Sequence, residues 1–108
     1  MADLITVQWC LLSEGLNFAD HGLGLILGQG RLTFHHNLIA HNQSRNPRFG
    51  TLVEGDFRNN VIYDWGDTAS CGEFERVNYV GNVLKPGPSK RRSMRLFHDG
   101  VDVISLDA

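Results

Sequence analysis

The feature that most constrains this chain is an eight-residue pattern that occurs four times without gaps. The third position of each copy is a large hydrophobic residue, the sixth is cysteine or asparagine, and the last two are aliphatic. Successive copies begin 27, 23 and 22 residues apart, and a period of this length with one short strand per unit is typical of solenoids. The copies occupy residues 5–12, 32–39, 55–62 and 77–84.

The repeat predicts which side chains point into the solenoid. Successive side chains of a β-strand point to opposite faces, so the third positions form an inner row and the second and fourth positions an outer one. The sixth-position asparagines can bond turn backbone and the asparagine of the next coil, as identical side chains do in ladders. By the same alternation Trp9 and His36 are expected to point inward. The inner row is Val7, Phe34, Phe57 and Tyr79, and the outer row includes Gln8, His35 and Arg58.

The fold class predicted is all-β, a right-handed parallel β-helix of about four coils. Helical spacing of apolar residues is nearly absent, and short runs rich in Val, Ile, Leu and Phe alternate with glycine and asparagine clusters. The recurring LxxLxL frame of leucine-rich repeats, the rival solenoid, is missing from this sequence. With 108 residues the chain is expected to be a single domain, residues 1–108. Residues 101–106 are a candidate for one more short strand, and residues 85–95 are expected to form a basic loop rich in Pro and Gly.

Composition excludes several classes of function. The formal net charge is −2, which gives no general basic field for nucleic acid, and the apolar runs are too short to span a membrane. Half of the ten basic residues lie between Lys85 and Arg95; this cluster is either a solvated loop or a contact for an acidic polymer. The first residues lack a signal-peptide pattern, so the chain is either not exported or a mature or trimmed piece.

Several motifs in order resemble the pectate lyases of polysaccharide lyase family 1, over roughly residues 5–89. They include Thr33-Phe-His-His-Asn-Leu-Ile-Ala-His-Asn42, Ser44-Arg-Asn-Pro-Arg-Phe49 and Asp56-Phe-Arg-Asn-Asn-Val-Ile-Tyr-Asp-Trp-Gly66. The resemblance implies a right-handed parallel β-helix and calcium-assisted cleavage of pectate, or polygalacturonate, by β-elimination. It also implies an acidic polysaccharide as partner and an extracellular, secreted location; oligomeric state stays open.

The resemblance assigns a role to Arg45. β-Elimination requires that the substrate carboxylate be neutralised and that a base take the neighbouring C5 proton. In the family the base is the arginine of an Arg-x-Pro motif, which Arg45-Asn46-Pro47 matches. Because arginine has a very high intrinsic pKa, a carboxylate clamp is the milder function for the same residue. Arg48, His21 and His41 are candidate substrate-binding residues, whereas the family's second arginine is replaced by Gly50.

The metal ligands cannot be assigned from this chain. Calcium takes six to eight oxygen ligands, commonly several carboxylates, and the family's acidic ligands lie mainly on coils that precede the matched part. Glu14 and Asp20 are acids near that edge, and loop capping suits them equally well. Ca²⁺ is therefore an expectation from the resemblance, with its ligands outside this chain.

Two other functions stay open. A short stack without the upstream acids could be a non-catalytic β-helix fragment that at most binds an acidic polysaccharide. A polygalacturonase would need paired carboxylates that flank the scissile bond, and the scattered acids here offer no evident pair.

Overall fold

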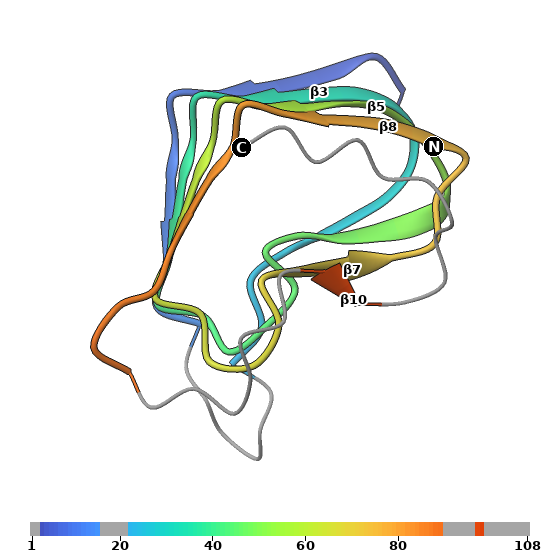
Figure 1. The fold of residues 1–108 in the computed structure, drawn as a ribbon. Coiled ribbons are helices and arrows are strands. Elements are labelled where there is room, and N and C mark those ends of the chain that lie inside the picture. The colour runs from blue at the N-terminus through green and yellow to red at the C-terminus, as the bar shows by residue number, and fades with distance from the viewer. Residues whose placement is uncertain (1–2, 16–21, 90–96, 99–108) are drawn as a thin grey trace.

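The computed structural model describes residues 3–15, 22–89 and 97–98, and within them the chain winds as a parallel β-helix (Figure 1). Every strand pairing is parallel, and β2, β4, β6 and β9 form one continuous four-stranded sheet. The predicted all-β solenoid is confirmed. The strands are β1 (Ile5–Gln8), β2 (Leu11–Ser13), β3 (Ile26–His35), β4 (Leu38–Ala40), β5 (Arg48–Arg58), β6 (Val61–Tyr63), β7 (Ser70–Gly72), β8 (Arg76–Val80), β9 (Val83–Lys85) and β10 (Phe97–His98).

Each copy of the repeat forms two strands joined by a sharp bend, not one straight strand. The bend residue has a positive φ in all four copies: 56° at Trp9, 55° at His36, 55° at Asn59 and 67° at Gly81. The left-handed conformation turns the chain through a corner, and strict alternation of faces stops there. The expectation that Trp9 and His36 point inward is therefore wrong. Trp9 is 74% exposed, His36 is exposed, and their rings stack outside the coil at 4.4 Å.

The predicted inner row is confirmed as an aromatic stack. Phe57 lies between Phe34 and Tyr79, with ring centroids 5.3 and 5.1 Å away and planes within 17° of parallel. All three side chains are buried, and Val7 packs against them from the first rung. Trp65, which the sequence left unplaced, is 1% exposed and belongs to the same core. Burial of these large apolar side chains supplies the main driving force for stacking the coils.

A ladder of asparagines runs beside the aromatic stack. Asn37, Asn60 and Asn82 are 3%, 0% and 1% exposed. Each side-chain oxygen accepts a backbone N–H from the coil before it. Asn37 Oδ1 accepts from Cys10, Asn60 Oδ1 from Asn37 and Asn82 Oδ1 from Asn60, at 2.9 to 3.0 Å. The ladder thus satisfies backbone donors at a corner where no sheet can form, and the prediction made from the repeat is confirmed.

The third side of the coil is built by segments that the repeat does not cover. β3 and β5 are long strands that bend, and their register shifts between Leu27 and Gln29, where Gly28 lies opposite Gly50 and Thr51. Below the bend Ile26 pairs with Arg48, and Arg48 with Cys71 of β7. β10 pairs with β7 in the same direction. Residues 101–106, for which an extra strand was expected, and residues 90–95 of the expected basic loop lie outside the described residues; β9 takes in Lys85.

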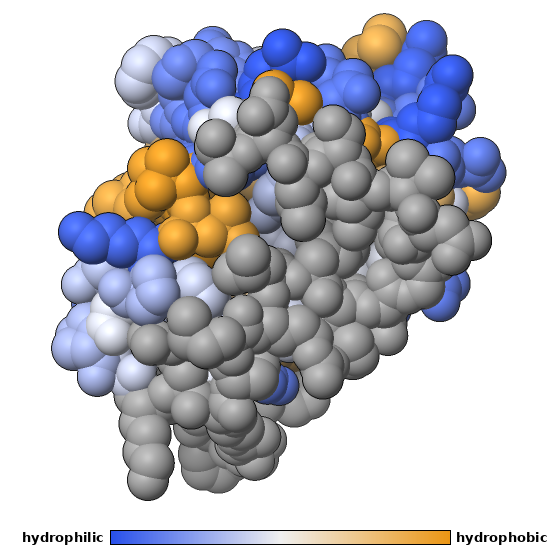
Figure 2. Space-filling model, viewed as in Figure 1, coloured by the Kyte–Doolittle hydropathy of each residue, from blue (hydrophilic) through white to orange (hydrophobic). Residues whose placement is uncertain are grey.

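The two sheets present different outer surfaces. A column of alternating charge runs from Asp3, just before β1, through Arg31 and Glu54 to Arg76, with ion pairs of 2.8 Å at both ends. Arg31, Glu54 and Arg76 line an open groove of about 650 Å³. The sheet of β2, β4, β6 and β9 instead presents aliphatic side chains, and Figure 2 shows apolar surface on that side. These are Leu11, Leu38, Val61 and Val83, which are 64%, 40%, 36% and 53% exposed. In the described part of the chain no helix is long and apolar enough to cross a membrane.

Candidate active site

The turn between β4 and β5, residues 41–47, carries the candidate residues His41 and Arg45, and Arg48 follows it directly. The turn is held between the coils on its two sides by backbone hydrogen bonds. The N–H groups of Gly24 and Leu25 in the preceding coil donate to the carbonyls of Ser44 and Arg45, at 2.9 and 2.8 Å. Asn46 in turn donates its N–H to Ala69 of the following coil at 2.8 Å. The turn is thus a fixed part of the solenoid, and its side chains project from a rigid backbone.

Arg45 sits in the middle of this turn in the left-handed conformation, with φ 58°. Its side chain is half-buried, and among the residues that the structure describes no carboxylate pairs with its guanidinium. Asn46 and Pro47, joined by a cis peptide bond, are buried behind it. Within the described ranges, the Arg-Asn-Pro motif therefore presents an arginine that has no carboxylate partner.

A short relay of two asparagines supports the turn from inside. Asn42 Oδ1 accepts the N–H of Gly15 at 2.8 Å, and Asn42 Nδ2 donates to Asn46 Oδ1 at 3.1 Å. Both side chains are almost fully buried, and within the described ranges Asn46 Nδ2 has no hydrogen-bond partner. The relay ties the backbone on both sides of Arg45 to the coil before it.

Arg48 begins β5 three residues after Arg45. Its neighbour Phe49 is 1% exposed and points into the core, so alternation directs the half-buried Arg48 outward. Gly50, where the family has a second arginine, has no room for a side chain: a Cβ there would overlap the carbonyl oxygen of Gly28 and lie 2.7 Å from its carbonyl carbon. The structure therefore offers two arginines, Arg45 and Arg48, in this segment.

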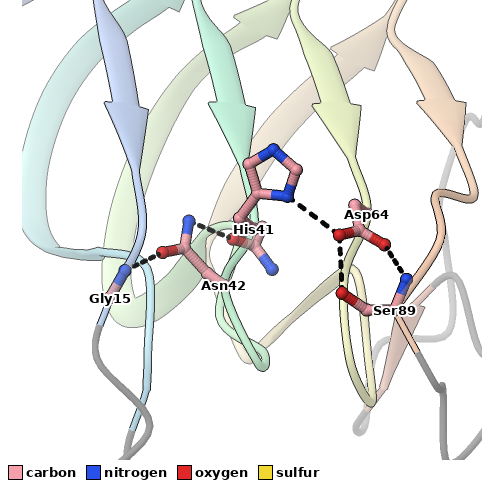
Figure 3. Close-up of polar contacts among 6 residues, drawn as sticks. Gly15, His41, Asn42, Asp64 and Ser89 are labelled. Carbon is pink, nitrogen blue, oxygen red and sulfur yellow. Dashed lines mark hydrogen bonds and ion pairs between the residues drawn. The ribbon is translucent and has the colours of Figure 1, made fainter.

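His41 lies at the start of the turn and contacts a buried carboxylate in the next coil (Figure 3). His41 Nδ1 is 2.8 Å from Asp64 Oδ2. Asp64 also accepts the backbone N–H of Ser89 on Oδ1 at 2.8 Å and the Ser89 hydroxyl on Oδ2 at 2.6 Å. The Asp64 side chain is 2% exposed and that of His41 is 43% exposed. The three residues join three successive coils into one hydrogen-bonded row.

The surroundings of Asp64 favour its ionised form. Burial by itself would raise the pKa of Asp64, but the two hydrogen bonds from Ser89 and the one from His41 outweigh it. The pKa of Asp64 consequently lies below its ordinary value. The carboxylate is therefore charged at neutral pH and can only accept hydrogen bonds.

The sequence identified only part of this arrangement. Arg45, Arg48 and His41 lie on one continuous segment, whereas His21 lies outside the described residues. Asp64 and Ser89 were missed, although the repeat held a signal for one of them. Asp64 follows Ile62 by two residues as His41 follows Ile39, and both have a positive φ, 56° and 57°. The same offset therefore places the two side chains at one corner of adjacent coils.

The described residues do not assemble a calcium site. They contain no group of three or more His, Cys, Asp or Glu side chains close enough to hold a metal ion. Glu14 is exposed and has a φ of 59° at the same corner as His41 and Asp64, and Asp20 lies outside the described ranges. A calcium ligand set made of several carboxylates does not fit what is present here.

The curated relatives that match this chain share one name, and their matches cover most of it. "Probable pectate lyase C" of Aspergillus terreus is 36% identical over 98% of this chain and 27% of its own length. The protein of that name from Neosartorya fischeri is 34% identical over 94% of the chain and 26% of its own length. That of Aspergillus fumigatus is 35% identical over 82% and 21%.

The chain thus spans about a quarter of the length of the relatives that it matches most extensively. No family model matches it, and no solved structure does. The name of these relatives is the family that the motifs around Arg45 indicated. The chain belongs to the pectate lyase family.

Proposed function

We propose that this chain is the part of a pectate lyase that carries the arginine of β-elimination, acting on an extracellular acidic polysaccharide such as polygalacturonate. One observation carries the proposal. The turn that presents Arg45 is fixed by backbone hydrogen bonds from both neighbouring coils, while no carboxylate among the described residues occupies the guanidinium. Such a group is preorganised for an anionic sugar without first breaking an internal ion pair.

The reaction assigns a distinct task to each arginine. Arg48 neutralises the substrate carboxylate, so that the neighbouring C5–H proton becomes acidic. Arg45, acting as the base in its neutral guanidine form, takes that proton. The electron pair forms a C4–C5 double bond as the C4–O bond breaks, and the departing oxygen is protonated by water. If Arg45 stays protonated throughout, it serves as a second carboxylate clamp.

Calcium has no step in this proposal. The resemblance implies that the ion would supply further neutralisation of the carboxylate, but the described residues do not form a site for it. We propose that any calcium dependence arises from ligands outside the part of the chain that the structure describes.

The proposal is tested with the full chain, polygalacturonate and added calcium, by the ultraviolet absorbance of the unsaturated product. Arg45→Lys keeps the charge but removes the planar guanidinium, and its rate is expected to fall at least about 100-fold. Arg31→Lys is the matched control, because Arg31 lies in the charged column on another face, and its rate should equal that of the wild type. Equal rates for Arg45→Lys and wild type would reject the role of Arg45.

A non-catalytic binding fragment is the second candidate. It is favoured by the quarter-length match to the relatives and by the absence of a carboxylate cluster among the described residues. This candidate predicts that oligogalacturonate binds in calorimetry but that no unsaturated product forms. New reducing ends without unsaturation would instead indicate the hydrolase chemistry of a polygalacturonase.

A further inference from the structure

We infer that Asp64 is the positioning residue of His41: it fixes the imidazole so that Nε2 accepts a hydrogen bond from a hydroxyl of the bound uronan. The inference rests on the proposed function, because it names the sugar group that His41 would meet. It adds one residue, Asp64, to a site that the family resemblance places at Arg45.

The hydrogen-bond geometry fixes the tautomer. Ser89 donates twice to Asp64, once from its backbone N–H and once from its hydroxyl. Both carboxylate oxygens therefore act as acceptors, and Asp64 Oδ2 can bind His41 only if Nδ1 carries the proton. In the neutral imidazole the lone pair then resides on Nε2. The lowered pKa of Asp64 agrees with this, since it keeps the carboxylate ionised.

The ring of His41 is also fixed in orientation. Its edge packs against Tyr63 with ring centroids 5.4 Å apart and planes 81° apart, and its backbone N–H donates to the carbonyl of Tyr63 at 3.1 Å. The buried Asp64 holds the inner edge of the ring, while 43% of the side chain is exposed. A histidine held in this way presents a single, defined acceptor at the surface.

This acceptor complements the arginines of the same segment. A uronan offers carboxylates, which guanidinium groups bind, and hydroxyls, which need an acceptor as well as a donor. Arg45 and Arg48 can only donate, so they cannot satisfy a hydroxyl proton. His41, four residues before Arg45 in one rigid turn, supplies the acceptor that they lack.

The tautomer is tested directly in the wild-type chain by long-range ¹H–¹⁵N correlation spectra of ¹⁵N-histidine-labelled protein. The spectra are recorded near pH 8.5, about two units above the ordinary histidine pKa. His41 is expected to show a protonated Nδ1 and an unprotonated Nε2. A protonated Nε2, or the averaged shifts of an unrestrained ring, would overturn the inference whatever the activity of the chain.

The role of Asp64 is tested by substitution. In Asp64→Asn the side-chain oxygen stays with the Ser89 N–H, so the amide NH₂ faces His41 and donates to Nδ1; the spectrum should invert to the Nε2–H tautomer. Ser89→Ala is the matched control, since it removes a bond to the same carboxylate oxygen but leaves His41 paired. An unchanged His41 spectrum in folded Asp64→Asn would show that Asp64 does not act through His41.

The sugar contact is tested by the affinity for hexagalacturonate, measured by calorimetry. His41→Ala and Asp64→Asn should each weaken binding about 3- to 10-fold. The double variant should bind no more weakly than His41→Ala, because both remove one contact. Ser89→Ala should stay within about twofold of wild type. Additive losses, or unchanged affinity in His41→Ala, would refute the contact; absence of binding by the wild type would refute the proposed function and this contact together, but not the tautomer.

Discussion

Asn60 Oδ1 accepts two hydrogen bonds from Asn37, one from its backbone N–H at 2.9 Å and one from its side-chain amide at 3.1 Å. Asn60 Nδ2 meanwhile donates to the Phe34 carbonyl and to Asn82 Oδ1. One fully buried amide thus satisfies groups in the coils on both sides. Any side chain that cannot donate and accept at this corner leaves buried polar groups without partners.

Asn60→Leu tests this relationship. Leucine has a similar size but makes none of the four hydrogen bonds, and each orphaned buried group costs about 1–3 kcal/mol. The free energy of unfolding in urea should fall by at least about 3 kcal/mol. Asn59→Gly, at the exposed bend residue next to it, is the control and should change stability by no more than about 0.5 kcal/mol. A loss in Asn60→Leu no greater than in this control would contradict the ladder as a source of stability.

Tyr79 gives the fold an alkaline limit. Burial raises the pKa of Tyr79 to about 12, although its hydrogen bond with Ser70 works in the opposite direction. A raised pKa means that the unfolded chain loses the proton first, so this stabilisation is complete below pH 10 and is lost as the pH rises to about 12. The lost free energy is about 3 kcal/mol.

Urea unfolding at pH 9 and pH 11.5 of wild type and Tyr79→Phe provides the measurement. As the pH rises, the free energy of unfolding of wild type should fall relative to that of Tyr79→Phe. Parallel pH profiles would mean that Tyr79 does not ionise on unfolding in this range.

Substitution by alanine should destabilise the fold at Gly50 but not at Gly28, the two glycines where the register of β3 and β5 shifts. In Gly50→Ala the new Cβ would overlap the Gly28 carbonyl, a backbone atom that cannot move aside, so a loss of about 2 kcal/mol or more in stability is expected. Gly28→Ala meets no atom within 4 Å and should be nearly neutral. Gly50→Arg, which would supply the family's second arginine, should be at least as destabilising as Gly50→Ala in thermal unfolding. Wild-type stability of Gly50→Arg would contradict the close approach.

The charged column predicts a salt-dependent effect. Glu54→Lys removes the ion pair with Arg76 and places a third cation between Arg31 and Arg76. Because these groups are exposed, the loss of stability should be small at low salt and should shrink further in 1 M NaCl. Glu73→Lys changes the net charge equally at an exposed position and is the control. Equal losses in the two variants would assign the effect to net charge and not to the column.

The sequence predicted those parts of the fold that depend on two-residue alternation. The stack of Phe34, Phe57 and Tyr79 and the asparagine ladder follow from a repeat aligned without gaps. Alternation failed one residue before each ladder position, because Trp9 and His36 adopt a positive φ that points the side chain outward. Only glycine at the equivalent Gly81 and asparagine at Asn59 hinted at that conformation.

The candidate site was predictable only as far as it is local in sequence. Arg45, Arg48 and His41 lie within one motif, so their proximity needed no knowledge of the fold. The contact of His41 with Asp64 joins residues 23 apart, and the contact of Asp64 with Ser89 joins residues 25 apart. Such contacts depend on the corner geometry of adjacent coils, which hydrophobic patterning does not report. The strand pairs of the third side, such as Arg48 with Cys71, were likewise outside the repeat.

The unequal spacing of the ladder residues, 27 and then 23 and 22, has a consequence for how such proteins diversify. Because the amide ladder fixes one corner of every turn, extra residues can enter only at the other corners. The corner that carries Arg45 and His41 is one of these, so the residues around the proposed site can change in number while the asparagine ladder stays in register.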